Sequence, residues 1–372
     1  MREGWKYQKL GELVKVINGL WVGKKPPFTN VAVVRNANFT KSCTLDMSNI
    51  AYIDVEEKQF NTRELQYADI IIEKSGGSEK QPVGRPVFFN IKDRGYSFSN
   101  FTATLRVVSS DIVPEYLYKV LLAQYKQGVT KRLQSKTTGL HNLDFKSYLK
   151  SVIPIPSCEK QLSIVSELDK INELIRLKKE QLKDYDNLAQ SIFYEMFGDP
   201  VVNEKGWEVK KFADLYKLKS GDSLSAKNFV EGEIPVYGGN GISGYHNDFN
   251  MDGDFIIIGR VGVYCGNVRE VHGKFWLTDN AFQLFYNREI QSPCFIHYLL
   301  EILDLHKYAN AAAQPVISNL TLKDVEIIIP PLPLQQAFAQ RIELIKKQKA
   351  EIQNTIADLE TLLASRMQYW FD

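Results

Sequence analysis

The sequence predicts an α+β protein built as an internal repeat, in which two globular blocks alternate with two long helices that pair in a coiled coil. Three observations support this prediction: two similar proline-flanked joins, two apolar patterns in one heptad register, and short β-branched and aromatic runs in both blocks. We expect a first block at 1–156, a first helix at 157–199, a second block at 200–333 and a second helix at 334–372.

The joins lead from each block into its helix. They read Ile155-Pro156-Ser157-Cys158-Glu159-Lys160-Gln161 and Pro330-Pro331-Leu332-Pro333-Leu334-Gln335-Gln336, and in both a proline precedes a glutamine by five residues. The block starts also match, because Gly4-Trp5 is repeated as Gly206-Trp207 and Gly19 corresponds to Gly221. Near the block ends, Asn142-Leu143 is matched with Asn319-Leu320.

Each predicted helix has an apolar seam whose members are spaced by alternating fours and threes. The first seam consists of Ile164, Leu168, Ile171, Ile175, Leu182, Tyr185, Ala189, Ile192 and Met196, with Lys178 as a polar member. A shift of 174 residues gives the second, Phe338, Ile342, Ile345, Ile352, Ile356, Leu359, Leu363 and Trp370, with Lys349 and Arg366 as polar members. Because ordinary surface helices seldom keep a strict 3.5-residue period for so long, we expect the two helices to pair.

The blocks themselves contain short strands separated by Gly- and Asn-rich turns. Apolar runs at 31–34, 70–72, 87–89, 256–258 and 282–286 are rich in β-branched or aromatic residues and indicate strands. One helix is expected in each block, around 114–127 and 293–306. Each block is therefore predicted to be α+β.

Bulk composition limits the class of protein only weakly. The 372 residues suffice for two cores, and 46 Lys and Arg against 44 Asp and Glu give a net charge of +2, so any basic surface must be local. Four cysteines without a C-x-x-C pair and the absence of a signal-peptide core indicate the cytoplasm. No apolar run is long enough to span a membrane.

The most specific motifs lie in the second block. They are Ile234-Pro235-Val236-Tyr237-Gly238-Gly239-Asn240-Gly241-Ile242-Ser243-Gly244-Tyr245, Ile257-Ile258-Gly259-Arg260-Val261-Gly262 and Phe275-Trp276-Leu277-Thr278-Asp279-Asn280-Ala281-Phe282. They resemble the target-recognition domain of the specificity (S) subunit of type I restriction-modification systems. The resemblance covers the whole chain, and Met196-Phe197-Gly198-Asp199-Pro200 is similar to that family's end of the first helix. The first block departs from it, with Lys74-Ser75-Gly76-Gly77 in place of Gly-Arg-x-Gly, which would mean a different half-site.

The resemblance implies a non-catalytic subunit of a DNA adenine methyltransferase or type I restriction endonuclease complex, without cofactor or metal. Its partners would be double-stranded DNA and two methyltransferase (M) subunits, with or without restriction (R) subunits. One recognition domain would read each half of a bipartite, asymmetric site. About thirty-six helical residues span about 54 Å, against about 34 Å per turn of duplex, so the helices would set the spacer. The second helix would return antiparallel and produce a pseudo-two-fold repeat.

Candidate DNA contacts are cationic, amide and hydroxyl side chains in polar loops beside strands, since these groups bind phosphates and base edges. In the first block they are Lys24, Lys25, Arg35, Asn36, Lys74, Arg85, Lys131, Arg132, Lys136, Thr137, Thr138 and His141. In the second block they are Lys227, Tyr237, Asn240, Tyr245, Arg260, Lys274, Gln314 and Ser318. The run at 131–138 is the strongest candidate because it combines charge with base-reading groups.

Sequence patterns for catalysis are weak. In Lys24-Lys25-Pro26-Pro27-Phe28, Lys25 stands where an adenine methyltransferase requires Asn or Asp, and Asp46 with Glu56-Glu57-Lys58 fits a charged loop better than a nuclease site. The five histidines lack metal-ligand spacing. The main alternative is a non-enzymatic coiled-coil adaptor protein with two ligand-binding domains, which sequence-specific retention on duplex DNA would distinguish.

Overall fold

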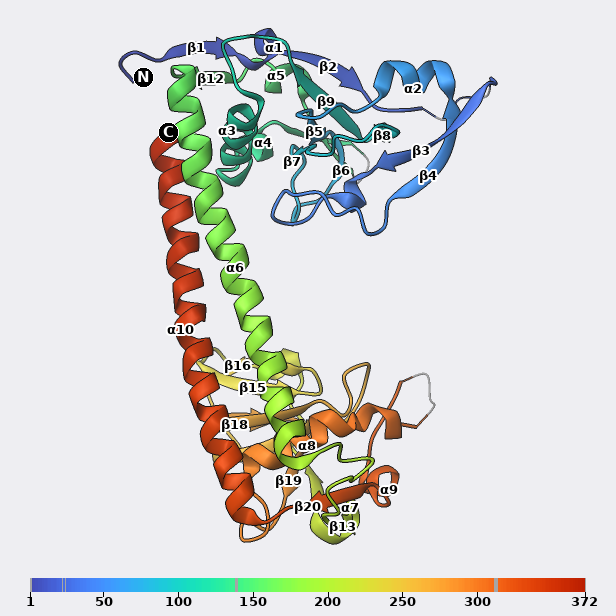
Figure 1. Cartoon of the computed structure of the whole chain (residues 1–372), viewed down its shortest axis with the longest axis vertical. Helices are drawn as coiled ribbons and strands as arrows, with labels where there is room; N and C mark the ends of the chain where they lie inside the picture. The colour runs from blue at the N-terminus through green and yellow to red at the C-terminus, as the bar shows by residue number, and fades with distance from the viewer. Residues whose placement is uncertain (1, 22, 24, 138–139, 311–313, 372) are drawn as a thin grey trace. The chain divides into compact units, whose positions relative to one another are not determined.

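Two units make up the chain, and the strand framework of the first recurs in the second (Figure 1). This computed structural model describes residues 2–21, 23, 25–137, 140–310 and 314–371. The first unit comprises 1–177 and 357–372, and the second comprises 178–356. Each unit therefore contains part of both 40-residue helices, α6 (Cys158–Phe197) and α10 (Leu332–Phe371).

The first unit contains four small sheets, with strand orders β2-β9-β5-β7, β4-β3-β8, β1-β12 and β10-β11-β6. The strands are β1 (Lys6–Lys9), β2 (Val14–Asn18), β3 (Phe28–Val34), β4 (Ala51–Glu56), β5 (Ile70–Glu73), β6 (Ser75–Gly77), β7 (Pro86–Phe88), β8 (Tyr96–Phe98), β9 (Thr102–Val107), β10 (Gln134–Thr137), β11 (Leu140–Leu143) and β12 (Val152–Ile155). The helices are α1 (Leu10–Leu13), η1 (Asn36–Asn38), α2 (Glu57–Arg63), α3 (Pro114–Lys126), α4 (Val129–Arg132) and α5 (Phe145–Tyr148).

In the described part of the second unit this framework recurs in the sheets β13-β20 and β14-β19-β17-β18-β15-β16. The strands are β13 (Glu208–Lys211), β14 (Lys217–Ser220), β15 (Ile234–Gly238), β16 (Gly241–His246), β17 (Met251–Gly259), β18 (Val268–Leu277), β19 (Ala281–Phe285) and β20 (Glu326–Ile329). The helices are α7 (Phe212–Leu215), η2 (Ala226–Asn228), α8 (Pro293–Leu303), η3 (Leu305–Tyr308) and α9 (Asn319–Leu322). The long β18 takes the places of both β7 and β8, since it pairs antiparallel with β17 and parallel with β15.

The central strand of each framework is an uninterrupted apolar run because both of its faces are covered. Ile70, Ile71 and Ile72 of β5 are fully buried, and 256–258 of β17 are at most 2% exposed. Both helices that follow the framework, α3 and α8, begin with proline, whose fixed φ suits the first helical turn. These strands and helices agree with those expected from the sequence, except that α8 ends at Leu303 instead of near 306, because Asp304 has a φ of +52°.

The glutamine of the first join fastens the framework to α6. Gln161 is fully buried, and its Oε1 accepts the Val113 N–H at the start of α3 at 2.8 Å. Its Nε2 donates to the carbonyls of Asp111 and Pro156 at 2.8 and 2.9 Å. One side chain thus forms hydrogen bonds with three backbone groups where β12, α3 and α6 lie next to one another.

The second join repeats this arrangement group for group. Gln335 is fully buried, and its Oε1 accepts the Ser292 N–H at the start of α8 at 2.9 Å. Its Nε2 donates to the carbonyls of Ile290 and Pro330 at 3.1 and 2.8 Å. The proline-to-glutamine spacing seen in the sequence therefore places the same hydrogen-bonding device in both units.

A second repeated detail is a close backbone approach at Gly19 and Gly221. A Cβ on Gly19 would lie 1.9 Å from the Ser99 carbonyl oxygen, and one on Gly221 would lie 2.1 Å from that of Leu277. Any side chain at these positions would force the backbones apart. The glycine match in the sequence thus reflects one shared packing constraint.

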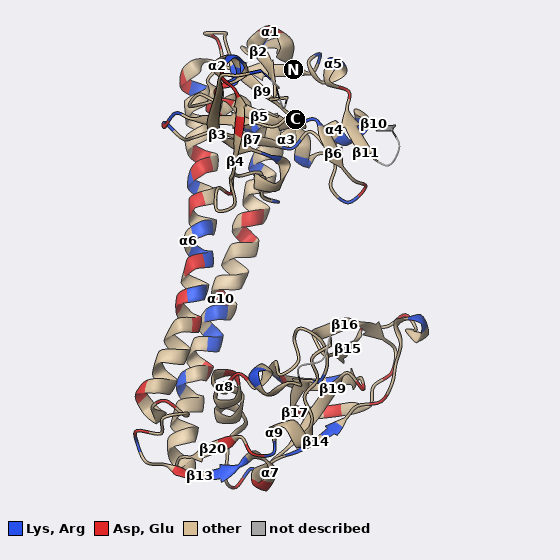
Figure 2. Cartoon of the chain, turned by 90° about the vertical axis from the view of Figure 1, so that its right-hand side faces the viewer, with Lys and Arg blue, Asp and Glu red and all other residues tan. Residues whose placement is uncertain are grey.

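The predicted seams form the buried faces of both long helices. In the first unit Ile164, Leu168, Ile171, Ile175, Leu363 and Trp370 are buried and Leu359 is half-buried. In the second unit Ala189, Phe338, Ile342, Ile345, Ile352 and Ile356 are buried, and Leu182, Tyr185, Ile192 and Met196 are half-buried. The other residues of α6 and α10 are largely exposed. Figure 2 shows acidic and basic residues interspersed along both helices.

Contacts within each unit show that the helices run antiparallel there. In the first unit Glu167 bonds to Arg366, while Lys160, a turn or two earlier, lies over the ring of Trp370. In the second unit Lys349 pairs with Asp186 and, further along in opposite directions, Arg341 lies 3.9 Å from Glu195. The polar seam members Lys349 and Arg366 therefore meet carboxylates of the other helix.

The buried face at the end of α6 is wider than the predicted seam, because Ile192 and Met196 pack against the core beside two residues that the seam does not include. Near the end of α6 the fully buried residues are Phe193 and Phe197, whereas the predicted Ile192 and Met196 are half-buried. Phe193 lies 5.7 Å from Phe338 and 5.8 Å from Phe295, ring centroid to centroid. The last turns of α6 thus pack against α8 as well as against α10. Gly198, at φ +75°, then ends the helix.

Candidate nucleic-acid interface

The described part of the 131–138 run, residues 131–137, lies at the three-stranded sheet β10-β11-β6 of the first unit. Lys131 and Arg132 are exposed at the end of α4, which precedes β10. His141 on β11 is half-buried and its Nδ1 lies 3.0 Å from Gln134 Oε1. Lys136 pairs with His141 in the backbone register, but the side chains of Lys136 and Thr137 are outside the described residues. Thr138 and Lys24 also lie outside them.

Hydrogen bonds connect η1 to the same sheet. The Asn36 Nδ2 donates to the Ser75 carbonyl at 2.7 Å, and the Ser75 Oγ lies 2.5 Å from Asn142 Oδ1. Arg35, next to Asn36, is half-buried and donates to the Asn49 carbonyl at 3.4 Å. Arg35, Asn36 and Lys74 are thus brought toward the β10–β11 hairpin through backbone segments that hydrogen-bond to one another. Lys25 lies on a different loop, where its N–H donates to Glu56 at 2.8 Å.

Arg85 corrects the sequence prediction. Its side chain is 4% exposed, and its Nε lies 3.1 Å from the Glu73 carboxylate, itself 1% exposed. Its Nη1 and Nη2 donate to the carbonyls of Phe39 and Asn36, at 2.8 and 3.3 Å. A guanidinium used in this way neutralises a buried carboxylate and has no surface to offer to DNA.

The three motifs of the second unit converge on one place. A Cβ on Gly259 would lie 2.3 Å from the Gly239 carbonyl, and one on Gly239 would lie 2.9 Å from that of Val261. Arg260 N–H donates to the Asn280 carbonyl at 2.9 Å, so the third motif touches the second. The glycines therefore allow the turn 238–241 to lie against 259–262. The side chain of Asn240 at its tip is exposed.

Sheet register shows that Lys74 and Arg260 occupy equivalent positions. Each follows the central strand, and the N–H of each donates to the carbonyl of the residue before the next strand, Phe101 or Asn280. Lys74 Nζ donates to Asn18 Oδ1 at 2.8 Å, and Arg260 Nη1 donates to Ser220 Oγ at 3.2 Å. Burial lowers the pKa of Lys74. Both units thus hold one half-buried cation at the same place, despite their different motifs.

The other predicted residues of the second unit differ in exposure. Tyr245 is 55% exposed, and Lys227, Asn240 and Gln314 are exposed. Tyr237 is half-buried, with its ring 5.4 Å from that of Phe275. Lys274 is exposed, with Nζ 4.5 Å from the Phe249 ring centroid. The exposed side chains at η2, β16 and the loops are therefore fully available to a ligand, and Tyr237 only in part.

Ser318 also requires correction. Its hydroxyl accepts the Thr321 N–H at 3.2 Å and caps α9, as Asp144 caps α5 by accepting the Ser147 N–H at 3.1 Å. The Ile317 N–H donates to the Arg260 carbonyl as the Leu143 N–H donates to that of Lys74. The structure therefore equates Leu143 with Ile317, which places the proposed match of Asn142-Leu143 with Asn319-Leu320 three residues out of register.

Gln134, which lies within the predicted 131–138 run, and Glu79, which the sequence did not indicate, line a pocket beside Lys131 and His141. Glu79 carries no sequence signal for DNA binding, because a carboxylate is repelled by phosphates and the predicted contacts are cationic, amide and hydroxyl groups. Among the described residues, no group of three His, Cys, Asp or Glu side chains could hold a metal ion. No helix in the described part of the chain is long and apolar enough to cross a membrane.

Comparisons with known proteins agree with this repeated framework. The family described as type I restriction modification DNA specificity domain matches residues 2–184 and 204–361. The specificity subunit of the EcoprrI type I restriction enzyme from Escherichia coli is 29% identical over 220 residues, which are 55% of this chain and 54% of that protein. The putative MjaX specificity subunit from Methanocaldococcus jannaschii is 21% identical over 97% of this chain and 93% of its own length.

Two solved structures share the fold. The S subunit of a type I restriction-modification system from M. genitalium has a TM-score of 0.57 and 15% identity, over 99% of this chain and 96% of its own. A chain from a study of complex assembly and conformational transition of the type I R-M system has a TM-score of 0.63 and 17% identity, over 100% of this chain and 98% of its own. With the family match in both units, the chain belongs to the specificity subunits of type I restriction-modification systems.

Proposed function

We propose that this chain is the non-catalytic DNA-binding subunit of a type I restriction-modification complex and that each unit reads one half of a bipartite, asymmetric site. The observation that carries the proposal is the repeated framework with different polar loops. Both units keep the buried glutamine, the close glycine approach and the cation after the central strand. The loops near that cation differ, with Lys74-Ser75-Gly76-Gly77 in the first unit and Arg260-Val261-Gly262 in the second, as two different half-sites require.

Contacts with DNA divide into two kinds. Lys25, Lys74, Lys131 and Arg132 in the first unit and Lys227, Arg260 and Lys274 in the second supply charge for phosphates. Asn36 and His141, and Tyr237, Asn240, Tyr245 and Gln314, supply the amide, imidazole and hydroxyl groups that discriminate base edges. Lys24, Lys136, Thr137 and Thr138 remain proposed contacts from the sequence.

We assign the long helices to partner binding and spacing. Because the joins and seams repeat, two methyltransferase subunits would meet equivalent surfaces, with restriction subunits added where the system has them. Each helix has 40 residues, a length of about 60 Å at 1.5 Å per residue. Deleting one heptad from each helix should leave both half-sites recognised and change the gap between them. An unchanged gap in the methylated motif would contradict the spacer role.

The proposal is tested by co-expressing the chain with an adenine methyltransferase from the same system and mapping methyladenine in host DNA by single-molecule sequencing. We expect a motif with two defined halves and a fixed gap that vanishes without this chain. S-adenosylmethionine and DNA with this chain alone should give no methylation. A continuous motif, or methylation that does not depend on the chain, would contradict the proposal.

A further inference from the structure

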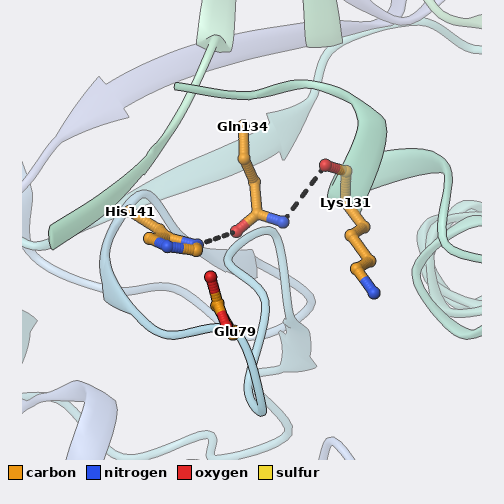
Figure 3. Close-up of a pocket in the computed structure, with 4 residues that line it drawn as sticks. All are labelled: Glu79, Lys131, Gln134 and His141. Atoms are coloured by element: carbon orange, nitrogen blue, oxygen red, sulfur yellow. Dashed lines mark hydrogen bonds between the residues drawn. The ribbon is translucent and has the colours of Figure 1, made fainter. Parts of the chain in front are cut away.

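A pocket of about 540 Å³ opens beside the β10–β11 hairpin of the first unit (Figure 3). Its lining residues are Glu79, Lys131, Gln134 and His141, which come from the loop after β6, from α4, from β10 and from β11. The volume is within the range of small-ligand sites, about 300–1,000 Å³. The described side chains that line it are all polar, so the pocket offers hydrogen-bonding groups to a ligand.

The orientation of the Gln134 amide is fixed by two backbone groups. Its Nε2 donates to the Lys131 carbonyl at 3.1 Å, and its Oε1 accepts the Val83 N–H at 3.4 Å. A carbonyl can only accept and a backbone N–H can only donate, so a flipped amide would break both hydrogen bonds. Gln134 therefore presents its oxygen to His141.

That oxygen determines which ring nitrogen of neutral His141 carries the proton. Gln134 Oε1 accepts only, so His141 Nδ1, 3.0 Å away, must carry the proton (Figure 3). In the neutral ring Nε2 is then left as an acceptor. Gln134 thus acts as a positioning residue that sets the tautomer of His141.

The remaining lining groups complete a defined pattern. Glu79 is exposed and its carboxylate has about four acceptor sites, so it can accept from a ligand in addition to any protein donor. In Figure 3 the Glu79 carboxylate points toward His141 and Gln134. Lys131 is exposed at the other wall and supplies a positive charge. The described lining residues therefore combine two acceptors with one cation.

We propose that this pocket reads an exocyclic amino group at the major-groove edge of the first half-site, with cytosine preferred to adenine. The inference rests on the proposed function. Cytosine presents only its N4 amino donor there, whereas adenine places the N7 acceptor beside its amino group. Guanine O6 and N7 and thymine O4 would face the Glu79 carboxylate, acceptor against acceptor, and be rejected. Lys131 would bind the neighbouring phosphate.

In the described part of the second unit a different residue stands at the position of His141, which makes the inference specific to one half-site. The backbone register that equates Leu143 with Ile317 places Pro315 where the first unit has His141. Proline offers no side-chain acceptor to a base edge. Changes at Glu79 and His141 should therefore alter one half of the recognised motif and leave the other half unchanged.

Two variants separate base reading from a structural role. Glu79→Gln keeps the size of the side chain but adds a donor, and His141→Asn keeps a nitrogen donor near Gln134 but loses the Nε2 acceptor. Glu12→Gln is the matched control, because Glu12 is an exposed carboxylate on α1, away from the pocket. Each chain is prepared as the complex with its methyltransferase subunits. Methyladenine mapping of the wild type first establishes the motif.

Duplex-binding titrations then compare the cognate site with sites in which each first-half cytosine or adenine is replaced in turn, including 2-pyrimidinone, which lacks the cytosine amino group. For the wild type we expect one position where removing the amino group weakens binding about tenfold or more. Glu79→Gln should lose that discrimination while binding non-specific duplex at least as tightly, because a negative charge is removed. Glu12→Gln should behave as the wild type.

The outcomes are distinguishable. A wild type without a bipartite motif overturns the proposed function itself. A bipartite wild-type motif that both pocket variants keep unchanged overturns only the pocket inference. Equal loss of cognate and non-specific binding in Glu79→Gln would show a structural role instead, and thermal unfolding of that complex would record the same loss. Discrimination carried by a guanine or thymine edge would also contradict the inference.

Discussion

The two units share a framework but differ in the residue that ends the central strand. Register equates Glu73 of β5 with Gly259 of β17. In the first unit Glu73 is buried and paired with Arg85, whereas in the second Gly259 lets the turn 238–241 approach. The residue that follows, Lys74 or Arg260, is a half-buried cation in both. The comparison shows that the strand framework is the same in both units. The residues that hold the loops against its central strand differ.

The difference also explains how one fold can present two chemistries. Glu73 and Arg85 fasten η1 to the strand through the Asn36 and Phe39 carbonyls, so the first unit is held by side chains. The second unit achieves the same closeness by removing side chains at Gly239 and Gly259. If this contrast is correct, substitutions at the residues that differ between the units should lower the stability of one unit only. Substitutions at residues that both units share should lower the stability of each unit to a similar extent.

The largest effect is expected from Arg85→Met. It would leave the buried Glu73 carboxylate unpaired, which costs about 3–5 kcal/mol, and it would do so in the first unit alone. Amide hydrogen exchange of the full chain should show lower protection in β5 and β9 with little change in β17 and β19. Arg94→Met, at an exposed position, is the control. An equal loss of protection in both units would mean that the Glu73–Arg85 pair does not stabilise the first unit specifically.

Gln161→Leu and Gln335→Leu test what the units share. Each removes a side chain that satisfies three backbone groups, and we expect each to lower the local free energy of unfolding by about 2 kcal/mol or more. The two losses should be similar, at the start of α3 and of α8 respectively, when followed by hydrogen exchange. A large effect in one unit and none in the other would break the equivalence of the joins.

The stability of the two units should also depend differently on pH. In each unit ionised side chains connect the block helix, α3 or α8, to a long helix, and only the connection in the second unit contains a histidine. In the second unit His297 of α8 lies 3.4 Å from Glu270 and 3.2 Å from Glu301, and Lys346 of α10 lies 2.6 Å from Glu270. Burial alone would lower the pKa of His297, but the two carboxylates outweigh it and raise the pKa to about 9. Burial would raise the pKa of Glu270, but His297 and Lys346 lower it to about 2.

The sign of the pH effect follows from these directions. The His297 contribution is complete below its ordinary pKa of 6.5 and is lost as pH rises toward 9, while that of Glu270 is complete above 4.5 and is lost toward 2. We expect the second unit to lose about 1–2 kcal/mol between pH 6.5 and 9. The first unit joins α3 to α6 through Lys119 and Asp169, without histidine. Hydrogen exchange against pH checks this, and His297→Gln should flatten the profile.

The smallest effect is expected in DNA binding by the first unit. Replacing Lys131, Arg132 and Lys136 by Gln should weaken binding of the complex by about tenfold at moderate salt and reduce the salt slope, by about 0.9 for each phosphate that the variant no longer neutralises. Lys217→Gln with Lys219→Gln, on exposed positions of β14, is a comparison that also removes positive charge. An unchanged salt slope would remove the 131–138 run from the interface.

Sequence patterns predicted those parts of the fold that depend on periodicity and spacing. The heptad registers, the proline-to-glutamine joins and the apolar central strands are local signals, and each corresponds to an observed element. The burial of Arg85 and the capping by Ser318 depend on the folded backbone around each residue, which the composition of a polar run does not reveal. Phe193 and Phe197 were missed because α8 adds a second packing direction that a two-helix seam does not contain.

The central claim is that one framework, used twice, reads two half-sites independently. It is tested most directly by replacing residues 1–156 with the corresponding segment of a related specificity subunit, co-expressing the chimera with the methyltransferase and sequencing methyladenine. The account predicts a motif in which one half changes while the other half and the gap stay the same. A motif that changes in both halves, or in neither, would contradict it.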